Sequence, residues 1–420
     1  MAEKHDIVLV NITGVDKPGL MAMVASTLAG YQAAVLDLGQ AIIHDTLALG
    51  LLVRVADAAA IPALEADLGA LLRAEGVPAT FQTISHQRYS DWVAAQGKTR
   101  YVLTLLARGV YAEQLAVIAT IMRDHGLNIE TVRRLTGRLP VGRLDSPDQQ
   151  TSIEFILRGT PTSEVALKSA LLEASAAAQF DFSLQRDSVY RRNRRLVAFD
   201  MDSTLIDAEV IDELARLHGK GAEVAAITER AMRGELDFKA SFRARAALLA
   251  GLPERALAEV ARTVELNEGA DRLLRALQRF GYRTAVLSGG FQYVGDVLRE
   301  RLGLDYVFAN RLVIENGVMT GAVDGEIVDA ERKASLLREL AVREGITLEQ
   351  TIAIGDGAND LLMLDAAGLG IAFHAKPLVR ASASHAISDF GLDALLYLLG
   401  FSDADIEEAL APLDDQVESG

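Results

Sequence analysis

The stretch LVAFDMDST at residues 196–204 constrains the fold of this chain more than any other. Its first four residues are all apolar, which predicts a strand buried on both faces. Asp200 and Asp202 follow directly. Ligands bind at the carboxyl ends of strands in an open α/β sheet, and two carboxylates this close repel each other. We therefore expect a positive partner there, such as a metal ion with oxygen ligands. The stretch alone also fits a strand that leads into a helix capped by Asp202 or Ser203.

Composition narrows the class of protein. A chain of 420 residues predicts two or three domains, and 50% hydrophobic with 24% charged residues is typical of a soluble globular protein. The formal net charge is −16 and no basic block is long, which argues against a nucleic-acid partner. We interpret one short basic run as a solvated linker; it consists of Arg191, Arg192, Arg194 and Arg195.

The sequence contains no cysteine, which excludes disulfides and thiolate metal sites. The N-terminal residues lack the apolar run and cleavage site of a signal peptide. No stretch approaches the ~20 consecutive apolar residues of a membrane span. The chain is therefore predicted to be cytoplasmic, with no membrane partner.

Two similar units are predicted before residue 190. The strands and helices of the first are expected, in chain order, at residues 7–12, 18–30, 34–43, 47–55, 62–73 and 79–84. Those of the second are expected at residues 101–107, 112–124, 129–135, 151–157, 163–178 and 180–185. The order is βαββαβ in both, which predicts a ferredoxin-like α+β fold with a four-stranded antiparallel sheet. The predicted domains are residues 1–88 and 99–186.

A short turn joins the first strand of the first unit to its first helix, and it reads GVDKPGL at residues 14–20. This region resembles a tandem pair of ACT domains, the amino-acid-sensing modules attached to metabolic enzymes. The resemblance implies an effector site at the turn, involving Asp16 and Gly19, where helix N–H groups can receive a carboxylate. The second unit has Gly109 at the corresponding turn but lacks the Asp-Lys-Pro-Gly signature. A spacer or dimerisation module without a ligand remains the alternative.

Residues suited to anion binding follow another predicted strand, at 282–287. They are Ser288, Gly289 and Gly290. A hydroxyl next to two glycines lets side-chain and backbone donors approach an anion closely. A glycine-rich turn without a ligand is the alternative reading.

Two more features lie towards the C-terminus. Lys333 opens a predicted helix, and the apolar strand at residues 351–354 leads into GDGAND at residues 355–360. Before Lys333 in the chain, the dipeptide Asn316-Gly317 predicts a type I′ turn in a β-hairpin. Taken singly, the lysine fits a solvated side chain and the acidic cluster fits a turn that caps a helix.

Taken together, the chain carries four motifs in a fixed order: Asp200-x-Asp202-x-Thr204, Ser288, Lys333 and Gly355-Asp356-x-x-x-Asp360. The set resembles the haloacid dehalogenase superfamily of phosphotransferases. Details within it resemble the phosphoserine phosphatase family, namely Glu209, Phe238, Arg245 and the run Ser288-Gly-Gly-Phe291. The resemblance implies an α/β fold with a Rossmann-like parallel-sheet core at 194–400, a helical cap at about 207–277 and an acidic tail at 401–420.

The resemblance implies hydrolysis of O-phospho-L-serine to L-serine and phosphate through an aspartyl phosphate, the last step of L-serine biosynthesis. Asp200 is implied to be the nucleophile, and Asp202 to protonate the leaving oxygen and later deprotonate water. The implied cofactor is Mg²⁺, bound by Asp200, the backbone carbonyl of Asp202 and Asp356, with Asp360 in support.

The implied substrate contacts come from both core and cap. Arg245 is implied to bind the carboxylate of phosphoserine and Glu209 its ammonium. The phosphate oxygens are implied to contact Ser288, Gly289 and Lys333. The remaining implied pocket residues are Met232, Phe238, Gly290 and Asn359.

A second class of function stays open at this point. The chain could be an amino-acid-sensing regulatory protein whose phosphatase core is vestigial or acts on another small phosphomonoester. Glu209 and Arg245 are then surface charges, while Met232 and Phe238 belong to the cap core. For either class of function, paired ACT-like sheets predict a homodimer. Which amino acid acts as effector, and whether it inhibits or activates, stays open.

Overall fold

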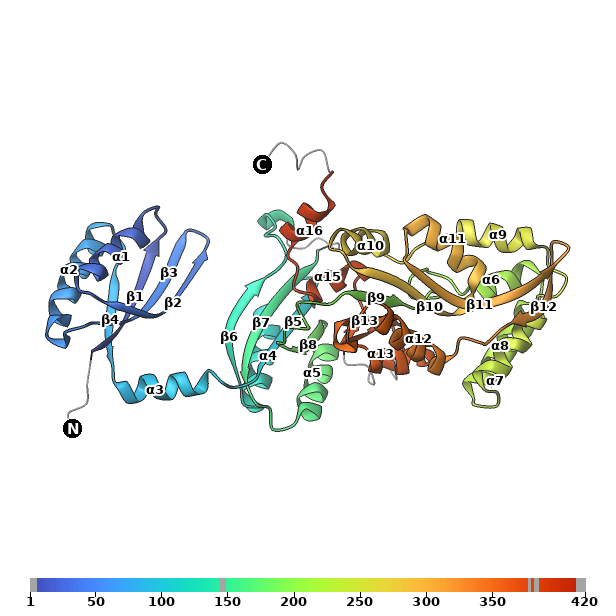
Figure 1. The fold of residues 1–420 in the computed structure, drawn as a ribbon, viewed down its shortest axis with the longest axis horizontal. Coiled ribbons are helices and arrows are strands. Elements are labelled where there is room, and N and C mark those ends of the chain that lie inside the picture. Colours follow the sequence, from blue (N-terminus) through green and yellow to red (C-terminus); the bar gives the residue numbers. More distant parts are fainter. Residues whose placement is uncertain (1–5, 144–148, 377–378, 381–384, 413–420) are drawn as a thin grey trace. The chain divides into compact units, whose positions relative to one another are not determined.

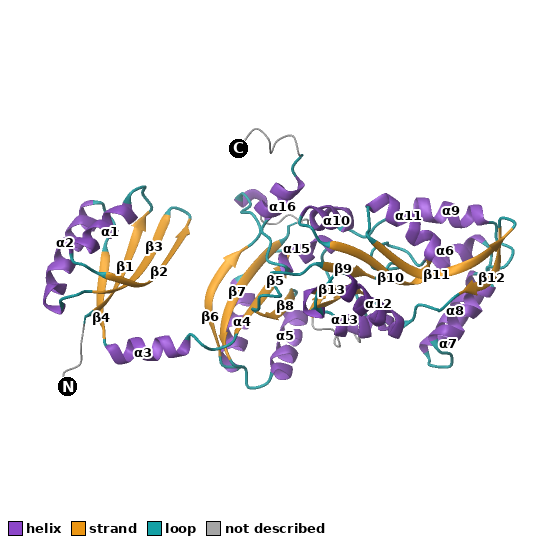
Figure 2. Ribbon diagram, viewed as in Figure 1, coloured by secondary structure: helices purple, strands orange, loops and turns teal. Residues whose placement is uncertain are grey.

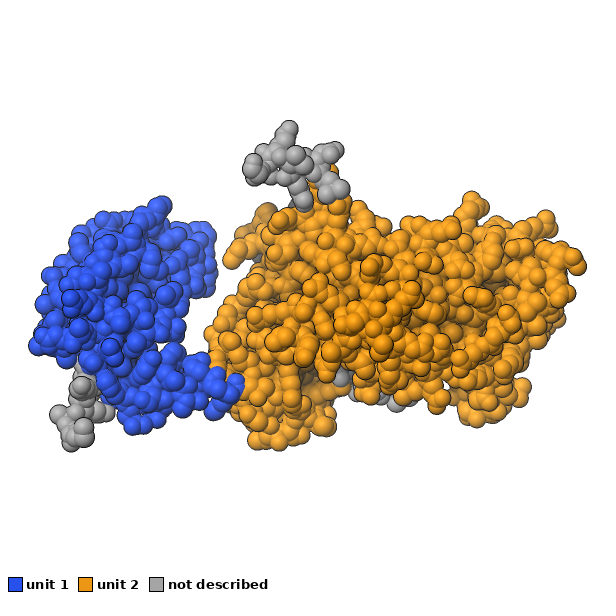
Figure 3. Space-filling model, viewed as in Figure 1, with its two compact units in different colours: residues 1–98 blue, residues 99–420 orange. Residues whose placement is uncertain are grey.

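The computed structural model describes residues 6–143, 149–376, 379–380 and 385–412. The chain divides into two compact units, Met1–Lys98 and Thr99–Gly420, which Figure 3 colours separately. The first predicted repeat lies in the smaller unit. The second lies in the larger unit, together with the remainder of the chain.

The smaller unit contains the predicted βαββαβ order. Its elements are β1 (Ile7–Val15), α1 (Leu20–Gly30), β2 (Ala34–Ile43), β3 (Thr46–Arg54), α2 (Ile61–Ala74) and β4 (Ala79–Ile84). The antiparallel sheet has the order β2-β3-β1-β4. Apolar residues four apart on α1 (Leu20, Val24, Leu28) and on α2 (Leu64, Leu68, Leu72) pack on the strands. The predicted order of strands and helices in this unit is confirmed.

One helix of the smaller unit was not predicted. Helix α3 (His86–Ala95) follows β4, and the Ser85 side chain caps it by accepting a hydrogen bond from Arg88 N at 3.3 Å. None of its residues is buried. A helix without a buried face leaves no apolar periodicity in the sequence, which explains the omission.

The second βαββαβ unit has the sheet order β6-β7-β5-β8. Its elements are β5 (Arg100–Ala107), α4 (Ala112–Asp124), β6 (Leu127–Arg134), β7 (Thr151–Gly159), α5 (Glu164–Ala178) and β8 (Asp181–Arg186). Its edge strand β8 packs against β15 (His385–Ile387), a strand of a second, larger sheet. This contact joins the unit to the remainder of the larger compact unit.

A seven-stranded sheet of order β12-β11-β10-β9-β13-β14-β15 forms the core of the larger unit. In sheet order, the strands are β12 (Val318–Asp324), β11 (Tyr306–Glu315), β10 (Arg283–Phe291), β9 (Leu196–Phe199), β13 (Thr351–Gly355), β14 (Leu369–Phe373) and β15 (His385–Ile387). β9 is central and parallel to both neighbours. Asn316 and Gly317 turn the β11–β12 hairpin with φ of 52° and 76°, as type I′ requires.

Helices cover both faces of this sheet (Figure 1). On one face, α10 (Ala270–Arg279) and α11 (Gln292–Leu302) share a core with Val197 and Phe199 of β9. On the other, α12 (Ala330–Arg343) and α13 (Leu361–Ala366) share a core with Leu196 and Ala198. The strand buried on both faces, predicted from four apolar residues, is confirmed.

The cap lies between β9 and β10 in sequence. It consists of α6 (Val210–Leu217), α7 (Gly221–Met232), α8 (Phe238–Ala247) and α9 (Glu254–Thr263). Figure 2 shows these helices beside the β11–β12 hairpin, and α8 packs against β12. Helix α10, predicted within the helical cap segment, packs instead on β10 and on α16 (Asp403–Leu410). The predicted tail therefore contains a helix that contacts the core.

The solvated-linker interpretation is wrong for two of its four arginines. Arg191 is buried and bonds Glu154 at 2.9 Å, and Arg194 is buried and donates to Gln185 Oε1 at 2.9 Å. Strands β7 and β8 supply these acceptors, which compensate the guanidinium groups for lost water. No helix in the described ranges is long and apolar enough to cross a membrane.

Candidate active site

The polar residues at the carboxyl ends of β9, β10 and β13 meet at one edge of the large sheet. Because β9 pairs in parallel with both other strands, their ends lie side by side. A cavity of about 90 Å³ opens at this edge, lined by residues of the strand ends and of the cap. The lining is Asp200, Asp202, Glu209, Ile211, Phe238, Phe242, Arg245, Ser288, Gly289, Gly290, Asp356 and Asn359.

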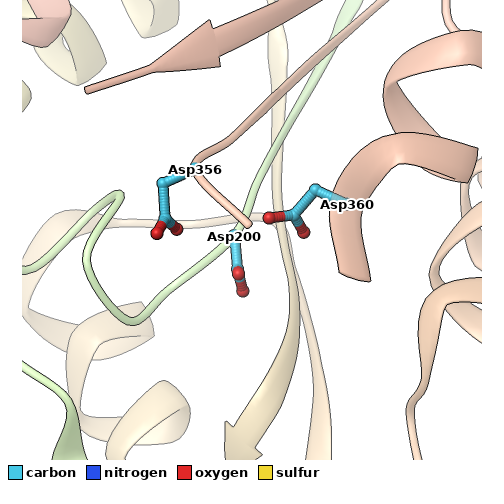
Figure 4. A group of neighbouring side chains, drawn as sticks. All are labelled: Asp200, Asp356 and Asp360. Carbon is cyan, nitrogen blue, oxygen red and sulfur yellow. The ribbon is translucent and has the colours of Figure 1, made fainter. Parts of the chain in front are cut away.

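Three carboxylates form a cluster at this cavity. Oxygens of Asp200, Asp356 and Asp360 lie within 4.8 Å of one another, and Figure 4 shows Asp200 between the other two. Lys333 Nζ lies 2.8 Å from Asp200 Oδ1 and 2.7 Å from Asp360 Oδ1. Lys333 and Asp360 are fully buried, and Lys333 contacts Asp200, which lines the cavity.

The cluster carries more negative than positive charge. Burial raises the pKa of Asp356, and the charge of Asp200 raises it further. Burial alone would lower the pKa of Lys333, but Asp200 and Asp360 raise it above its ordinary value. One ammonium cannot balance three carboxylates, and every candidate ligand is a hard oxygen. The residues therefore fit a divalent cation of the type that prefers oxygen ligands.

The environment of Asp202 favours the protonated form of its carboxyl group. Burial raises its pKa well above the ordinary value, and the charges of Glu209 and Asp200 act in the same direction. Its Oδ1 accepts a hydrogen bond from Val210 N at 3.2 Å. A Cβ on Gly290 would lie 2.3 Å from Asp202 Oδ2, so only glycine leaves room for this carboxyl.

The C-terminal part of β10 forms one wall of the cavity, through Ser288, Gly289 and Gly290. Ser288 Oγ accepts a hydrogen bond from Gly290 N at 2.8 Å. Phe238 of the cap packs on Gly289, where a Cβ would come within 2.8 Å of its ring. Asn310 fixes this part of β10, donating to Gly289 O at 2.8 Å and accepting from Val328 N at 2.8 Å.

The sequence did not predict that Asn310 supports the site. It is 1% exposed and lies in β11. A polar residue at the end of an apolar run was the available signal, but its partners belong to two other segments.

The cap contributes two opposite charges. Arg245 lies on α8, and burial lowers its pKa. Its Nε is buried without a hydrogen-bond partner among the described residues. Glu209, immediately before α6, reaches solvent at the cavity mouth and accepts a hydrogen bond from Ser203 Oγ at 2.9 Å. The surrounding protein desolvates the Glu209 carboxyl and raises its pKa.

Most predicted site residues are brought together, and a few are not. Met232 is 70% exposed and lines a wider cleft of about 850 Å³, which it shares with Phe238, Arg245 and Asn359. It does not line the inner cavity. In the smaller unit, Gly19 has φ 91° directly before α1, and Asp16 is exposed beside it. Gly109 lines a cavity of about 510 Å³ in the larger unit.

Comparisons with known proteins agree with this geometry. A family model described as haloacid dehalogenase-like hydrolase matches residues 197–365, and an ACT domain model matches residues 6–82. The chain is 42% identical over 407 residues to a phosphoserine phosphatase of Streptomyces coelicolor, covering 97% of this chain and 95% of that one. It is 38% identical to phosphoserine phosphatase SerB2 of Mycobacterium tuberculosis, covering 96% and 95%.

A solved structure shows the same fold. A HAD family hydrolase from Salmonella enterica serovar Typhi superposes with a TM-score of 0.61 at 32% identity. The match covers 71% of this chain and 98% of that one.

Proposed function

The chain belongs to the phosphoserine phosphatase family of haloacid dehalogenase-like hydrolases, and we propose that it hydrolyses O-phospho-L-serine to L-serine and phosphate, the last step of L-serine biosynthesis. The observation that carries the proposal is the buried Nε of Arg245, which has no hydrogen-bond partner among the described residues and belongs to a side chain that shares one small cavity with Glu209 and Asp200. A buried N–H donor requires an acceptor. The carboxylate of phosphoserine supplies one, and a planar carboxylate matches the guanidinium fork.

Substrate binding follows from the charges around the cavity. With its carboxylate at Arg245 and its ammonium at Glu209, the substrate directs its phosphate towards Asp200. Ser288, Gly289 and Lys333 then bind the phosphate oxygens, where charge develops during transfer. Phe238, Gly290 and Asn359 line the cavity around it, and Met232 stands at the wider cleft.

We assign the nucleophilic step to Asp200. Its Oδ1 accepts hydrogen bonds from Met201 N at 2.7 Å and is bound by Lys333, so Oδ2 attacks phosphorus. As the new P–O bond forms, the P–O bond to the serine side chain breaks, and the leaving oxygen takes its proton from Asp202. Water then attacks phosphorus and gives a proton to Asp202, which releases phosphate and restores Asp200.

The proposed cofactor is Mg²⁺, held by Asp200, the backbone carbonyl of Asp202 and Asp356. Asp360 supports this group through Lys333 and through a hydrogen bond from Gly357 N at 3.0 Å. The ion would offset the repulsion between the phosphate and these carboxylates. Thr204 donates to Asp356 Oδ1 at 3.1 Å and so fixes a ligand oxygen.

The proposal includes regulation by an amino acid at the first ACT-like unit, where Gly19 and Asp16 flank the N-terminus of α1. It also includes a homodimer in the cytoplasm. Apolar side chains exposed along the edge strand β2 support association; they are Val35, Leu38, Ile42 and Ile43. Sedimentation of the full chain and calorimetric titration with L-serine test these two points.

Phosphate release from O-phospho-L-serine and from a panel of sugar and protein phosphates, with and without Mg²⁺, tests the proposed reaction. We expect a strong preference for phosphoserine and dependence on the ion. Equal rates across the panel would contradict the substrate assignment and favour a broad phosphomonoesterase or a mainly regulatory protein.

A further inference from the structure

We propose that Ser203 is a positioning residue that sets substrate specificity, because its hydroxyl holds the Glu209 carboxylate where the substrate's ammonium binds. This inference rests on the proposed function, since it takes Glu209 as the ammonium site. Ser203 has an unusual backbone conformation, and its hydroxyl donates a hydrogen bond to Glu209 that can be tested by substitution.

The backbone of Ser203 is unusual. Its φ is 56°, in the left-handed region that glycine adopts more easily than any other residue. Strained positions of this kind persist where the surroundings determine them and are frequent at functional sites. A glycine here would remove the strain and also the hydroxyl. The presence of serine therefore directs attention to what the hydroxyl contacts.

Two hydrogen bonds from Ser203 close the loop that leads to the cap. Its N donates to Ala208 O at 3.2 Å, and its Oγ donates to Glu209 Oε1 at 2.9 Å. The first bond fixes the residue that precedes Glu209. The second fixes the carboxylate itself, which would otherwise rotate freely at the cavity mouth.

The charges around Glu209 explain why a hydrogen bond is needed to keep its carboxylate in position. Asp200, Asp212 and Asp356 all repel it. Without the hydroxyl, this repulsion would turn the carboxylate towards solvent and away from the cavity. A preorganised carboxylate binds the ammonium without first losing rotational freedom. The serine thus contributes to binding of a substrate that carries an ammonium and little to one that lacks it.

The test compares O-phospho-L-serine with its deamino analogue, 3-phosphooxypropionate, in Ser203→Ala and Ser203→Gly. Loss of one charge-assisted hydrogen bond predicts a KM for phosphoserine raised about five- to tenfold, with a much smaller rise for the analogue. Ser335→Ala is the matched control, because Ser335 also donates to a glutamate, Glu339 at 3.3 Å, but on the surface of α12.

The glycine variant separates positioning from a structural role. Glycine fits φ 56° better than serine, so we expect Ser203→Gly to be at least as heat-stable as the wild type and still to lose selectivity. A glycine variant that keeps the wild-type selectivity overturns the role of Ser203. In Glu209→Gln, adding Ser203→Gly should change the selectivity no further. A wild type that does not prefer phosphoserine over the analogue contradicts the proposed function itself.

Discussion

Lys333 Nζ lies 2.8 Å from Asp200 Oδ1, and the lysine side chain is 0% exposed. The contact joins helix α12 to the end of the central strand β9. Breaking a buried ion pair strongly destabilises a protein, because removal of one partner leaves an uncompensated charge. Lys333 thus fixes the proposed nucleophile and balances part of the acidic cluster.

Lys333→Met should lower both stability and activity. Asp200 and Asp360 lose their shared cation, so we expect the free energy of unfolding to fall by about 3–5 kcal/mol. Phosphate release should fall by about a hundredfold or more. Chemical denaturation and a phosphate assay measure the two effects. Arg338→Met, which removes an exposed cation from the same helix, should change neither by much. Equal behaviour of the two variants would contradict this role of Lys333.

Arg245→Met should act mainly on substrate binding. Loss of a charge-assisted contact to the carboxylate predicts that kcat/KM for phosphoserine falls by about 30- to 150-fold, mostly through KM. Arg243→Met is the control, since Arg243 lies two residues away on α8 and is exposed. A similar loss in both variants would show that net positive charge of the cap, rather than the Arg245 contact, matters.

Gly290→Ala should displace the proton donor. The new Cβ would lie 2.3 Å from Asp202 Oδ2 and 2.7 Å from Met201 Cε, so one of these groups must move. We expect kcat to fall by about a hundredfold while the fold persists, because a general acid contributes about 10²–10⁴-fold. Gly30→Ala has open space around the added methyl and serves as the control. Full activity of Gly290→Ala would contradict the position of Asp202.

His385 should make the stability of the larger unit depend on pH. It is buried, its Nδ1 lies 3.0 Å from Ser183 Oγ, and burial, with the charges of Arg194 and Lys168, lowers its pKa to about 3. The unfolded chain binds a proton below its ordinary pKa of about 6.5, whereas the folded chain does not. The contribution of neutral His385 to the stability of the larger unit is therefore fully present above about pH 6.5 and is lost as the pH falls towards 3. The expected loss between pH 7 and pH 5 is about 2 kcal/mol.

His385→Gln removes this titration, so its stability should change less over the same range. Urea unfolding of both proteins at each pH gives the comparison. Parallel pH profiles of wild type and variant would contradict the assignment to His385.

The sequence predicted those elements whose structure depends only on the residues within them. Four apolar residues were sufficient for β9, and Asn316-Gly317 for the β11–β12 turn, because each depends on its own conformation or burial. The order of the strand-end motifs then placed Asp200, Ser288 and Asp356 together, since parallel strands end at one edge.

Features that depend on distant partners could not be predicted in this way. Arg191 and Arg194 look like a solvated run, and only the acceptors Glu154 and Gln185 explain their burial. Similarly, the amphipathic pattern of α10 predicts a helix but does not say that it packs on the core sheet. The contact between Ser203 and Glu209 also depends on a left-handed residue that the sequence does not reveal.

The central claim is that Asp200 carries the phosphoryl group during turnover. Mass spectrometry of peptides from enzyme quenched during hydrolysis of phosphoserine tests it most directly. We predict a phosphoryl group on the peptide that contains Asp200 in the wild type, and neither this adduct nor phosphate release in Asp200→Asn. Phosphate release that survives in Asp200→Asn, or a phosphoryl group on another residue, would contradict the account.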